Sequence, residues 1–185
     1  MTTSSPHRTS PHRITRWPMR LAAAVAAAAA LGTAGCAPSG STAVQAGDRA
    51  VTMATFEKDV ANCSDLASSQ TMSPRQVIAS TEVQAAVGEE LLARSGRTLT
   101  NAQRDVIMTQ NQLSALVTKP VCRDMGRRLA SLYAVAGNSP DAATLVADVK
   151  KLGVQVNPRL GQWYPEQLAV AGSGSLSSLW TGARS

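Results

Sequence analysis

Histidine and aromatic residues are scarce in this chain. Its two histidines, His7 and His12, lie close to the N-terminus, so residues 36–185 contain none. Ser-His or Cys-His catalytic pairs and histidine-ligated metal sites therefore have no residues to form them there. Only 3% of the residues are aromatic, which leaves few rings on which nucleic-acid bases could stack. We expect no catalytic residue, no metal, no cofactor and no nucleic-acid partner.

Acidic residues are absent from the first 35 positions, where four arginines precede an uncharged, alanine-rich run from Leu21 to Thr33. A basic segment followed by a short apolar segment is the layout of a signal peptide. The apolar run is shorter than the roughly 20 residues that span a bilayer. We therefore predict that residues 1–35 are a cleaved signal peptide. The remaining chain carries 14 basic and 12 acidic residues, so the high pI is no argument for nucleic-acid binding.

Cysteine occurs only three times, and the first, Cys36, follows the small residues Thr33, Ala34 and Gly35. This segment resembles the lipobox of bacterial lipoproteins, in which the cysteine accepts diacylglycerol and becomes the mature N-terminus. Thr33 stands where the pattern usually has a hydrophobic residue. Two acyl chains hold a protein stably at a membrane. The resemblance implies a lipid-anchored protein on the extracytoplasmic face of the cell membrane; the alternative is an ordinary signal peptide with a chance cysteine.

The other two cysteines, Cys63 and Cys122, are expected to form a disulfide. Two thiols in an oxidising compartment most often pair. Cys63 lies on an apolar stripe with Phe56 and Val60, and Cys122 begins a stripe that continues through Met125, so both can face one core. The alternative is two separate buried thiols.

Helix start signals recur along the chain. Ser or Thr precedes several apolar repeats, with Pro at the first helical position or Gln at the third. The first predicted helix begins at Met53, and the second begins at Pro74 with a possible restart at Thr81. The third runs from after Thr100 to Lys119, and the fourth runs from Val121 to Gly137. The last begins at Ser139-Pro140-Asp141. Three pairs of adjacent charges on these helices are interpreted as solvated faces: Glu89-Glu90, Arg127-Arg128 and Lys150-Lys151; the alternative for the two basic pairs is contact with lipid headgroups.

Short strand patterns lie near both ends of the predicted mature chain. Ala43–Val51 reads as two strands around a Gly-Asp turn, and Val154–Trp163 contains a third. Because lone hairpins are marginal, we predict that the two segments pair, with the Trp163 ring covering the joint. The fold class is thus mainly α with a small β element. We divide the chain into the signal peptide, a flexible tether (36–45), a helical domain (46–164) and a Gly/Ser-rich tail (165–185).

The order of strand, Gly-Asp turn, strand and helix over Ala43–Val60 resembles the opening of SurA-type N-terminal domains. The segment Gln76 to Ile107 is similar to the same family. The motif Asn157, Pro158, Arg159, Leu160, Gly161, Gln162 and Trp163 looks like the NPRYG-x-W segment of actinobacterial lipoproteins that carry this domain, with Leu160 where the family has Tyr.

The resemblance implies a holdase-like chaperone or assembly factor of the cell envelope, whose partners would be unfolded or nascent secreted polypeptides. Adaptable apolar surface would bind them, and the methionine candidates are Met53, Met72, Met108 and Met125, of which Met53 and Met125 are assigned to the core. The alternative is a non-catalytic accessory lipoprotein that docks one specific envelope partner. A parvulin domain is absent, so we expect no prolyl isomerase activity.

Overall fold

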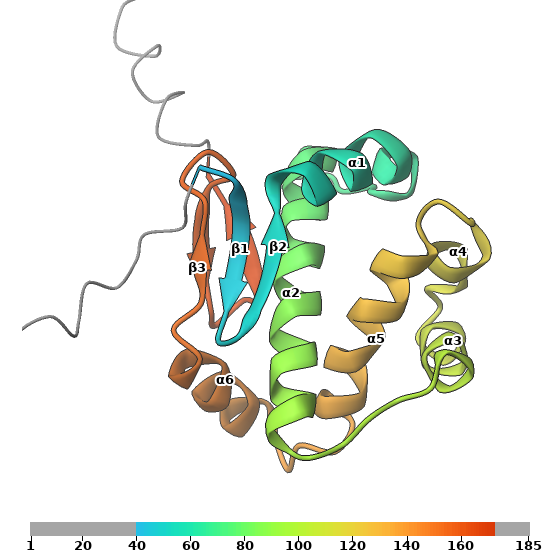
Figure 1. Ribbon diagram of the computed structural model, residues 1–185, viewed down its shortest axis with the longest axis vertical. Helices are drawn as coiled ribbons and strands as arrows, with labels where there is room; N and C mark the ends of the chain where they lie inside the picture. The colour runs from blue at the N-terminus through green and yellow to red at the C-terminus, as the bar shows by residue number, and fades with distance from the viewer. Residues whose placement is uncertain (1–39, 173–185) are drawn as a thin grey trace, which may run out of the picture. The chain divides into compact units, whose positions relative to one another are not determined.

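The computed structural model describes residues 40–172, which form six α-helices and five short strands (Figure 1). The predicted signal peptide, the lipidation site Cys36 and the tail beyond residue 172 lie outside the described residues. The strands are β1 (Thr42–Ala46), β2 (Arg49–Thr52), β3 (Gln155–Val156), β4 (Gln162–Tyr164) and β5 (Ala169–Ala171). The helices are α1 (Met53–Cys63), α2 (Pro74–Arg94), α3 (Asn101–Gln110), α4 (Ser114–Thr118), α5 (Arg123–Ala136) and α6 (Ala142–Lys151), and a 3₁₀ turn (Ser64–Leu66) follows α1.

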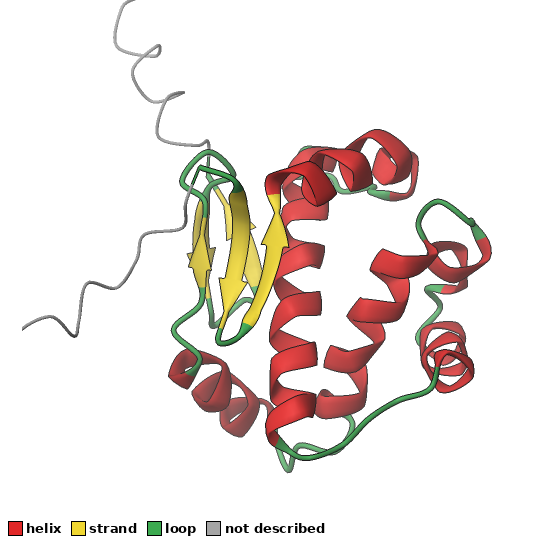
Figure 2. Ribbon diagram, in the orientation of Figure 1, coloured by secondary structure: helices red, strands yellow, loops and turns green. Residues whose placement is uncertain are grey.

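The long helix α2 lies at the centre of the fold. The strands pack on one side of it and α5 packs on the other (Figure 2). At Gly88 the two helices approach so closely that a Cβ atom would overlap the backbone of Leu132 in α5. Residues on several sides of α2 are buried, including Ile78, Val83 and Val87. The core therefore surrounds this helix instead of lying along one stripe.

A three-stranded antiparallel sheet joins the two ends of the described chain, in the order β2-β1-β3. Gly47 makes the hairpin turn between β1 and β2 with a φ of +56°, a conformation that glycine adopts without steric cost. Val44 of β1 pairs with Val156 of β3, which confirms the predicted meeting of the N-terminal and C-terminal segments. The mainly helical fold with a small antiparallel sheet is also confirmed.

The predicted helix starts are confirmed where a side chain caps the helix. Thr52 and Asp141 each accept a hydrogen bond from a backbone N–H in the first turn of α1 and α6. Ser73 and Thr100 form complete capping boxes with the glutamines three residues later, at the starts of α2 and α3. These caps satisfy backbone donors that have no partner within the helix.

Two predictions about helix continuity are wrong. The restart at Thr81 does not occur, because the hydroxyls of Ser80 and Thr81 donate to carbonyls four residues earlier and α2 continues through them. Conversely, the helix predicted from Thr100 to Lys119 is interrupted. Gln112 adopts a φ of +60°, which separates α3 from α4.

Both predicted boundaries of the domain are also displaced. The tether ends before residue 45, because β1 begins at Thr42 and its Val44 is fully buried between β2 and β3. The folded domain extends past the predicted boundary at residue 164, because residues 169–171 form β5, which pairs with β4. Val170, opposite Trp163 in that pair, is fully buried in the core. The sequence does not predict this second sheet.

Polar side chains of α2 hold β5 in place. Ser80 accepts a hydrogen bond from the backbone N–H of Val170 at 2.9 Å. One turn on either side, Gln84 donates to the carbonyl of Leu168 at 2.8 Å and Gln76 donates to the carbonyl of Gly172 at 2.9 Å. Because Gln76, Ser80 and Gln84 are four residues apart, they share one face of the helix. We call these three side chains the α2 polar ladder.

Candidate functional site

The sequence motif at residues 157–163 forms a corner that fastens the C-terminal strands to β1. The Asn157 side chain is buried; its Nδ2 donates to the carbonyl of Thr42 at 2.9 Å, and its Oδ1 accepts from the backbone N–H of Arg159 at 3.1 Å. Its backbone N–H also donates to the carbonyl of Ala43. The buried amide thus satisfies strand backbone groups, which is a structural role.

The rest of the motif shapes the same corner. Gly161 has a φ of +125°, and a Cβ atom there would lie 2.8 Å from the carbonyl oxygen of Ala171. Leu160 is buried in the core, and Trp163 packs partly buried against it. Pro158 and Arg159 are exposed. The buried residues of the motif therefore have a structural role in this corner.

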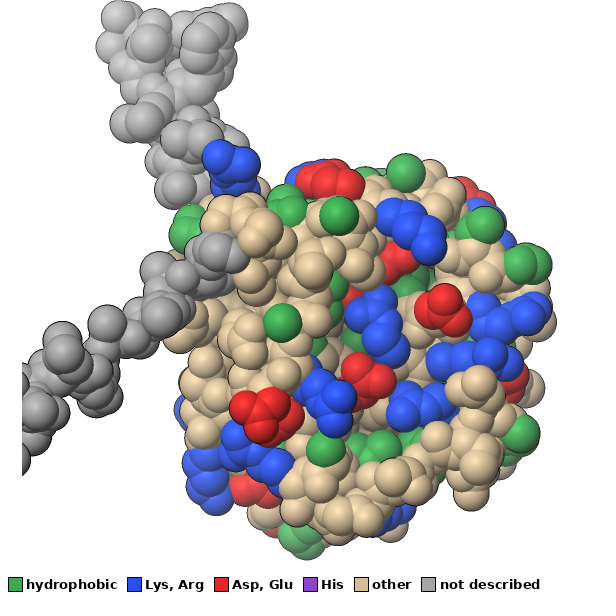
Figure 3. Space-filling model, in the orientation of Figure 1, with side chains coloured by type: hydrophobic (Ala, Val, Ile, Leu, Met, Phe, Trp, Pro, Cys, Tyr) green, Lys and Arg blue, Asp and Glu red, His purple; other side chains and the backbone are tan. Residues whose placement is uncertain are grey.

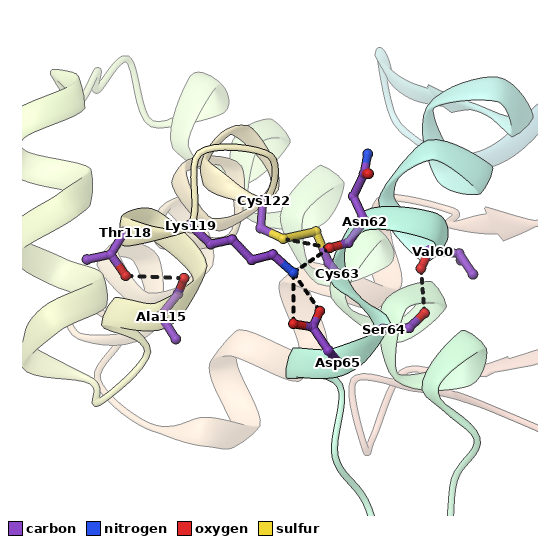
Figure 4. Close-up of polar contacts among 9 residues, drawn as sticks. All are labelled: Val60, Asn62, Cys63, Ser64, Asp65, Ala115, Thr118, Lys119 and Cys122. Carbon is purple, nitrogen blue, oxygen red and sulfur yellow. Dashed lines mark hydrogen bonds and ion pairs between the residues drawn. A yellow bond between two sulfur atoms is a disulfide. The ribbon is translucent and has the colours of Figure 1, made fainter.

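Cys63 at the end of α1 and Cys122 just before α5 are joined by a disulfide, with Cα atoms 5.8 Å apart (Figure 4). This is compatible with the predicted pairing. Lys119 adds a second link across the same junction. Its Nζ donates to the carbonyl of Asn62 at 2.7 Å and to the Asp65 carboxylate at 2.7 Å. A covalent bond and an ion pair together fix α1 against the start of α5.

A buried charge cluster connects α1, α2 and α5. Arg128 of α5 makes two hydrogen bonds to the Glu82 carboxylate, both of 2.8 Å, and one of 3.2 Å to Asp59 of α1. Glu82 is fully buried and Asp59 is nearly so. The pKa of Glu82 is raised to about 7, chiefly because burial removes its hydration; the Asp59 carboxylate acts in the same direction, and the Arg128 guanidinium opposes both.

Two of the three predicted solvated faces are therefore wrong. Arg128 is largely buried because it is the only cation facing two buried carboxylates in this cluster. Glu90 is buried as well; it pairs with Arg94 at 2.8 Å and lies against the Gly47 turn. Arg127 pairs bidentately with Asp105 of α3. Adjacent like charges on α2 and α5 diverge toward different neighbouring elements instead of facing solvent together.

A polar pocket of about 480 Å³ opens at the C-terminal end of α2. It is lined by three arginines from three different segments: Arg49 of β2, Arg97 of the loop after α2, and Arg104 of α3. Glu89 is the acidic residue in its wall, and Leu92 and Leu99 are among its apolar contacts. We call this site the arginine pocket. The sequence analysis did not predict this pocket. Its signal in the sequence is the spacing of Arg94, Arg97 and Arg104, which lie close to the end of one helix and the start of the next.

A second hollow of about 230 Å³ adjoins the arginine pocket and shares Arg97 with it. Leu91, Val135 and Leu145 contribute much of its apolar wall, from α2, α5 and α6. Its volume is below the range of roughly 300–1,000 Å³ that is usual for small-molecule sites.

Large apolar side chains are rarely exposed in the part of the chain that the structure describes. Val106, Val121 and Tyr164 are the three that are, and they lie on different segments. Figure 3 shows hydrophobic side chains scattered among charged and polar ones on one face of the molecule. Met108, a candidate for adaptable surface, is fully buried beside α5. The exposed large apolar side chains of residues 40–172 are thus few and come from separate segments.

Comparison of the chain with protein-family models, curated proteins and solved structures gives no match. Among residues 40–172, no helix is long and apolar enough to cross a membrane. Within the same residues, no three acidic, cysteine or histidine side chains gather as metal ligands would.

Proposed function

We propose that this chain is a lipid-anchored, extracytoplasmic accessory protein that docks one specific partner of the cell envelope and has no catalytic activity. The observation that carries this proposal is the nature of its described surface. Few large apolar side chains are exposed there, and several charged side chains are held in ion pairs between elements. A fixed polar surface favours recognition of one complementary partner, whereas promiscuous binding relies on surfaces that can repack.

Two links between helices, a disulfide and a buried charge cluster, hold this surface rigid. The disulfide ties α1 to the start of α5, and the buried cluster around Arg128 ties α1 and α2 to the middle of α5. Partners with preorganised surfaces bind with little ordering cost. The anchor at Cys36 and the extracytoplasmic location remain part of the proposal, supported by the lipobox-like segment and by the disulfide, which suits an oxidising compartment.

We also propose a relationship to SurA-type N-terminal domains. Its support is the order of hairpin, Gly-Asp turn and helix in β1, β2 and α1, and the way in which the motif around Asn157 fastens the C-terminal strands to β1. A relationship in fold leaves the function open, because function depends on the site.

Cross-linking in intact cells tests the docking function. The wild-type chain treated with a short cross-linker should give one discrete heavier species, and Cys36→Ala should lose it because the unprocessed precursor lacks the lipid anchor that positions the domain beside its partner. Val106→Ser is the matched surface control and should keep the species, because this exposed side chain does not line the arginine pocket and the lipid anchor is unchanged. A broad smear of many cross-linked products would contradict a single partner.

A holdase-like chaperone is the second candidate, and the α2 polar ladder favours it. Gln76, Ser80 and Gln84 recognise β5 mainly through its backbone, a mode that is independent of side-chain sequence. If other extended segments can take the place of β5, excess unfolded client should compete for the ladder. The wild-type chain would then slow aggregation of an unrelated unfolded protein, and Gln84→Ala should weaken that effect. Light scattering that is unchanged by equimolar wild-type protein would rule this candidate out.

A further inference from the structure

The three guanidinium groups of the arginine pocket differ in how firmly they are held. Arg104 is fixed: its Nη1 donates to the carbonyl of Arg127 at 2.7 Å and to the Ser131 hydroxyl at 2.6 Å, and its side chain is only 16% exposed. Its Nε donates to the carbonyl of Leu99 in the pocket wall. This arginine is therefore a rigid part of the pocket.

The other two guanidinium groups are available to a ligand. Arg49 is about half exposed, and its nearest acidic neighbour, Glu90, is 3.9 Å away and already bound to Arg94. The Arg97 side chain is exposed and makes no ion pair or hydrogen bond with any other residue in the described part of the chain. At this cavity Arg97 thus has no ion pair within the described residues, and Arg49 has only a long contact to a carboxylate that Arg94 already binds.

A structural explanation accounts for only part of this arrangement. Cations near the C-terminal end of a helix are stabilised by its dipole, and Arg94, in the last turn of α2, fits that role. Arg49 and Arg104 belong to a strand and to another helix, so the dipole of α2 does not explain their placement. The ion pair of Arg104 with Glu89, at 3.7 Å, offsets only one of the three positive charges.

We propose that the arginine pocket binds a phosphate monoester group. Three arginines and one glutamate leave a formal charge of +2, which matches the charge of −1.5 to −2 that a phosphate monoester carries near pH 7. Planar guanidinium groups bind phosphate oxygens through paired hydrogen bonds. The pocket has room for a group beyond the phosphate, and Leu92, Ala93 and Leu99 supply apolar contacts for it. The inference does not depend on the proposed docking function.

Calorimetric titration of the full chain with phenyl phosphate tests this assignment. Wild type should bind with a Kd below about 1 mM, and the double variant Arg49→Ala with Arg97→Ala should bind at least about tenfold more weakly, because two charge-assisted contacts are removed. Both side chains are exposed, so the variant should fold. Arg159→Ala, an exposed arginine outside the pocket, is the matched control and should bind as wild type does. Benzoate, with one charge and the same ring, should bind more weakly than phenyl phosphate.

Vesicles identify the source of the phosphate. Binding to phosphatidic acid vesicles that is lost in the double variant, together with phenyl phosphate binding, would assign a lipid headgroup; phenyl phosphate binding alone would assign a soluble or polymer-borne phosphate. The proposal is overturned if wild type fails to bind phenyl phosphate, if the double variant binds it as tightly as wild type, or if benzoate binds equally well.

Discussion

Replacing Glu82 with Gln should remove most of the pH dependence of stability between pH 5 and pH 8. Glu82 is fully buried and its pKa is raised to about 7, against 4.5 in an unfolded chain. A folded-state pKa above the unfolded one means that the folded state binds more protons between these values, so stability falls as the pH rises through this window. For wild type, the two pKa values give a loss of about 2.5 kcal/mol in the free energy of unfolding from pH 5 to pH 8.

The range from pH 5 to pH 8 isolates the effect of Glu82 on stability, because few other groups titrate in it. Residues 36–185 contain no histidine, and the carboxyl groups of Glu57, Asp65 and Asp105 have lowered pKa values because each accepts hydrogen bonds from a cation. These groups stay ionised in the folded and unfolded states above about pH 5. In Glu82→Gln, Arg128 keeps its contact with Asp59, so the variant should fold with a nearly flat stability profile.

Urea unfolding, followed by circular dichroism at four pH values without reductant, measures the effect. Glu57→Gln is the matched control and should keep the wild-type slope, because Glu57 is exposed at the surface of α1 and paired with Arg75. The reasoning is refuted if wild type and Glu82→Gln show the same slope, or if wild-type stability rises between pH 5 and pH 8.

Four further predictions follow from the sequence and the structure. Replacing Cys63 and Cys122 together with Ala should lower the free energy of unfolding by about 4 kcal/mol, because the bridge spans 59 positions; an unchanged urea midpoint would contradict it. Gly88→Ala should cost about 1–3 kcal/mol in the same assay, because its methyl group would overlap the backbone of α5. Cys36→Ala should leave an unprocessed precursor without a lipid adduct by mass spectrometry. A peptide isomerisation assay with the purified chain should give only the background rate.

The helix starts could be predicted because each depends on a few neighbouring residues. Ser73 with Gln76 and Thr100 with Gln103 satisfy each other's backbone donors locally, whatever packs around them. The disulfide pairing could be predicted for a different reason, since only two cysteines remained after Cys36. The pairing of β1 with β3 followed from the marginal stability of short isolated strands.

The β5 strand could not be predicted because its support is distant in sequence. Residues 169–171 are too few to show a pattern, and their hydrogen bonds come from β4 and from side chains about 90 positions away on α2. Gln76, Ser80 and Gln84 carry a spacing of four, which indicates one helix face but not what that face binds. A polar face of this kind is usually assigned to solvent.

The burial of Glu82 and Arg128 was missed because α2 and α5 were each interpreted as helices with one apolar stripe. In the structure, α2 is enclosed by the strands, α1 and α5, so even a charged position on it loses water. A charge on an enclosed helix requires an opposite charge, and the nearest candidate came from a helix 46 positions later. Sequence spacing within one helix carries no information about such a partner.

The disulfide and the buried charge cluster both limit how this domain could expose apolar surface. Separating α1 from α5 would break a disulfide whose loop constraint stabilises the fold by about 4 kcal/mol. It would also break the hydrogen bond from Arg128 to the nearly buried Asp59, and a hydrogen bond to a charged group contributes about 1.5–3 kcal/mol. Displacing β5 breaks only the short β4 pairing, three ladder contacts and the burial of Val170. If the domain holds extended polypeptides, the β5 face of α2 is therefore where exchange would occur, and a reducing agent alone should not be enough to separate α1 from α5.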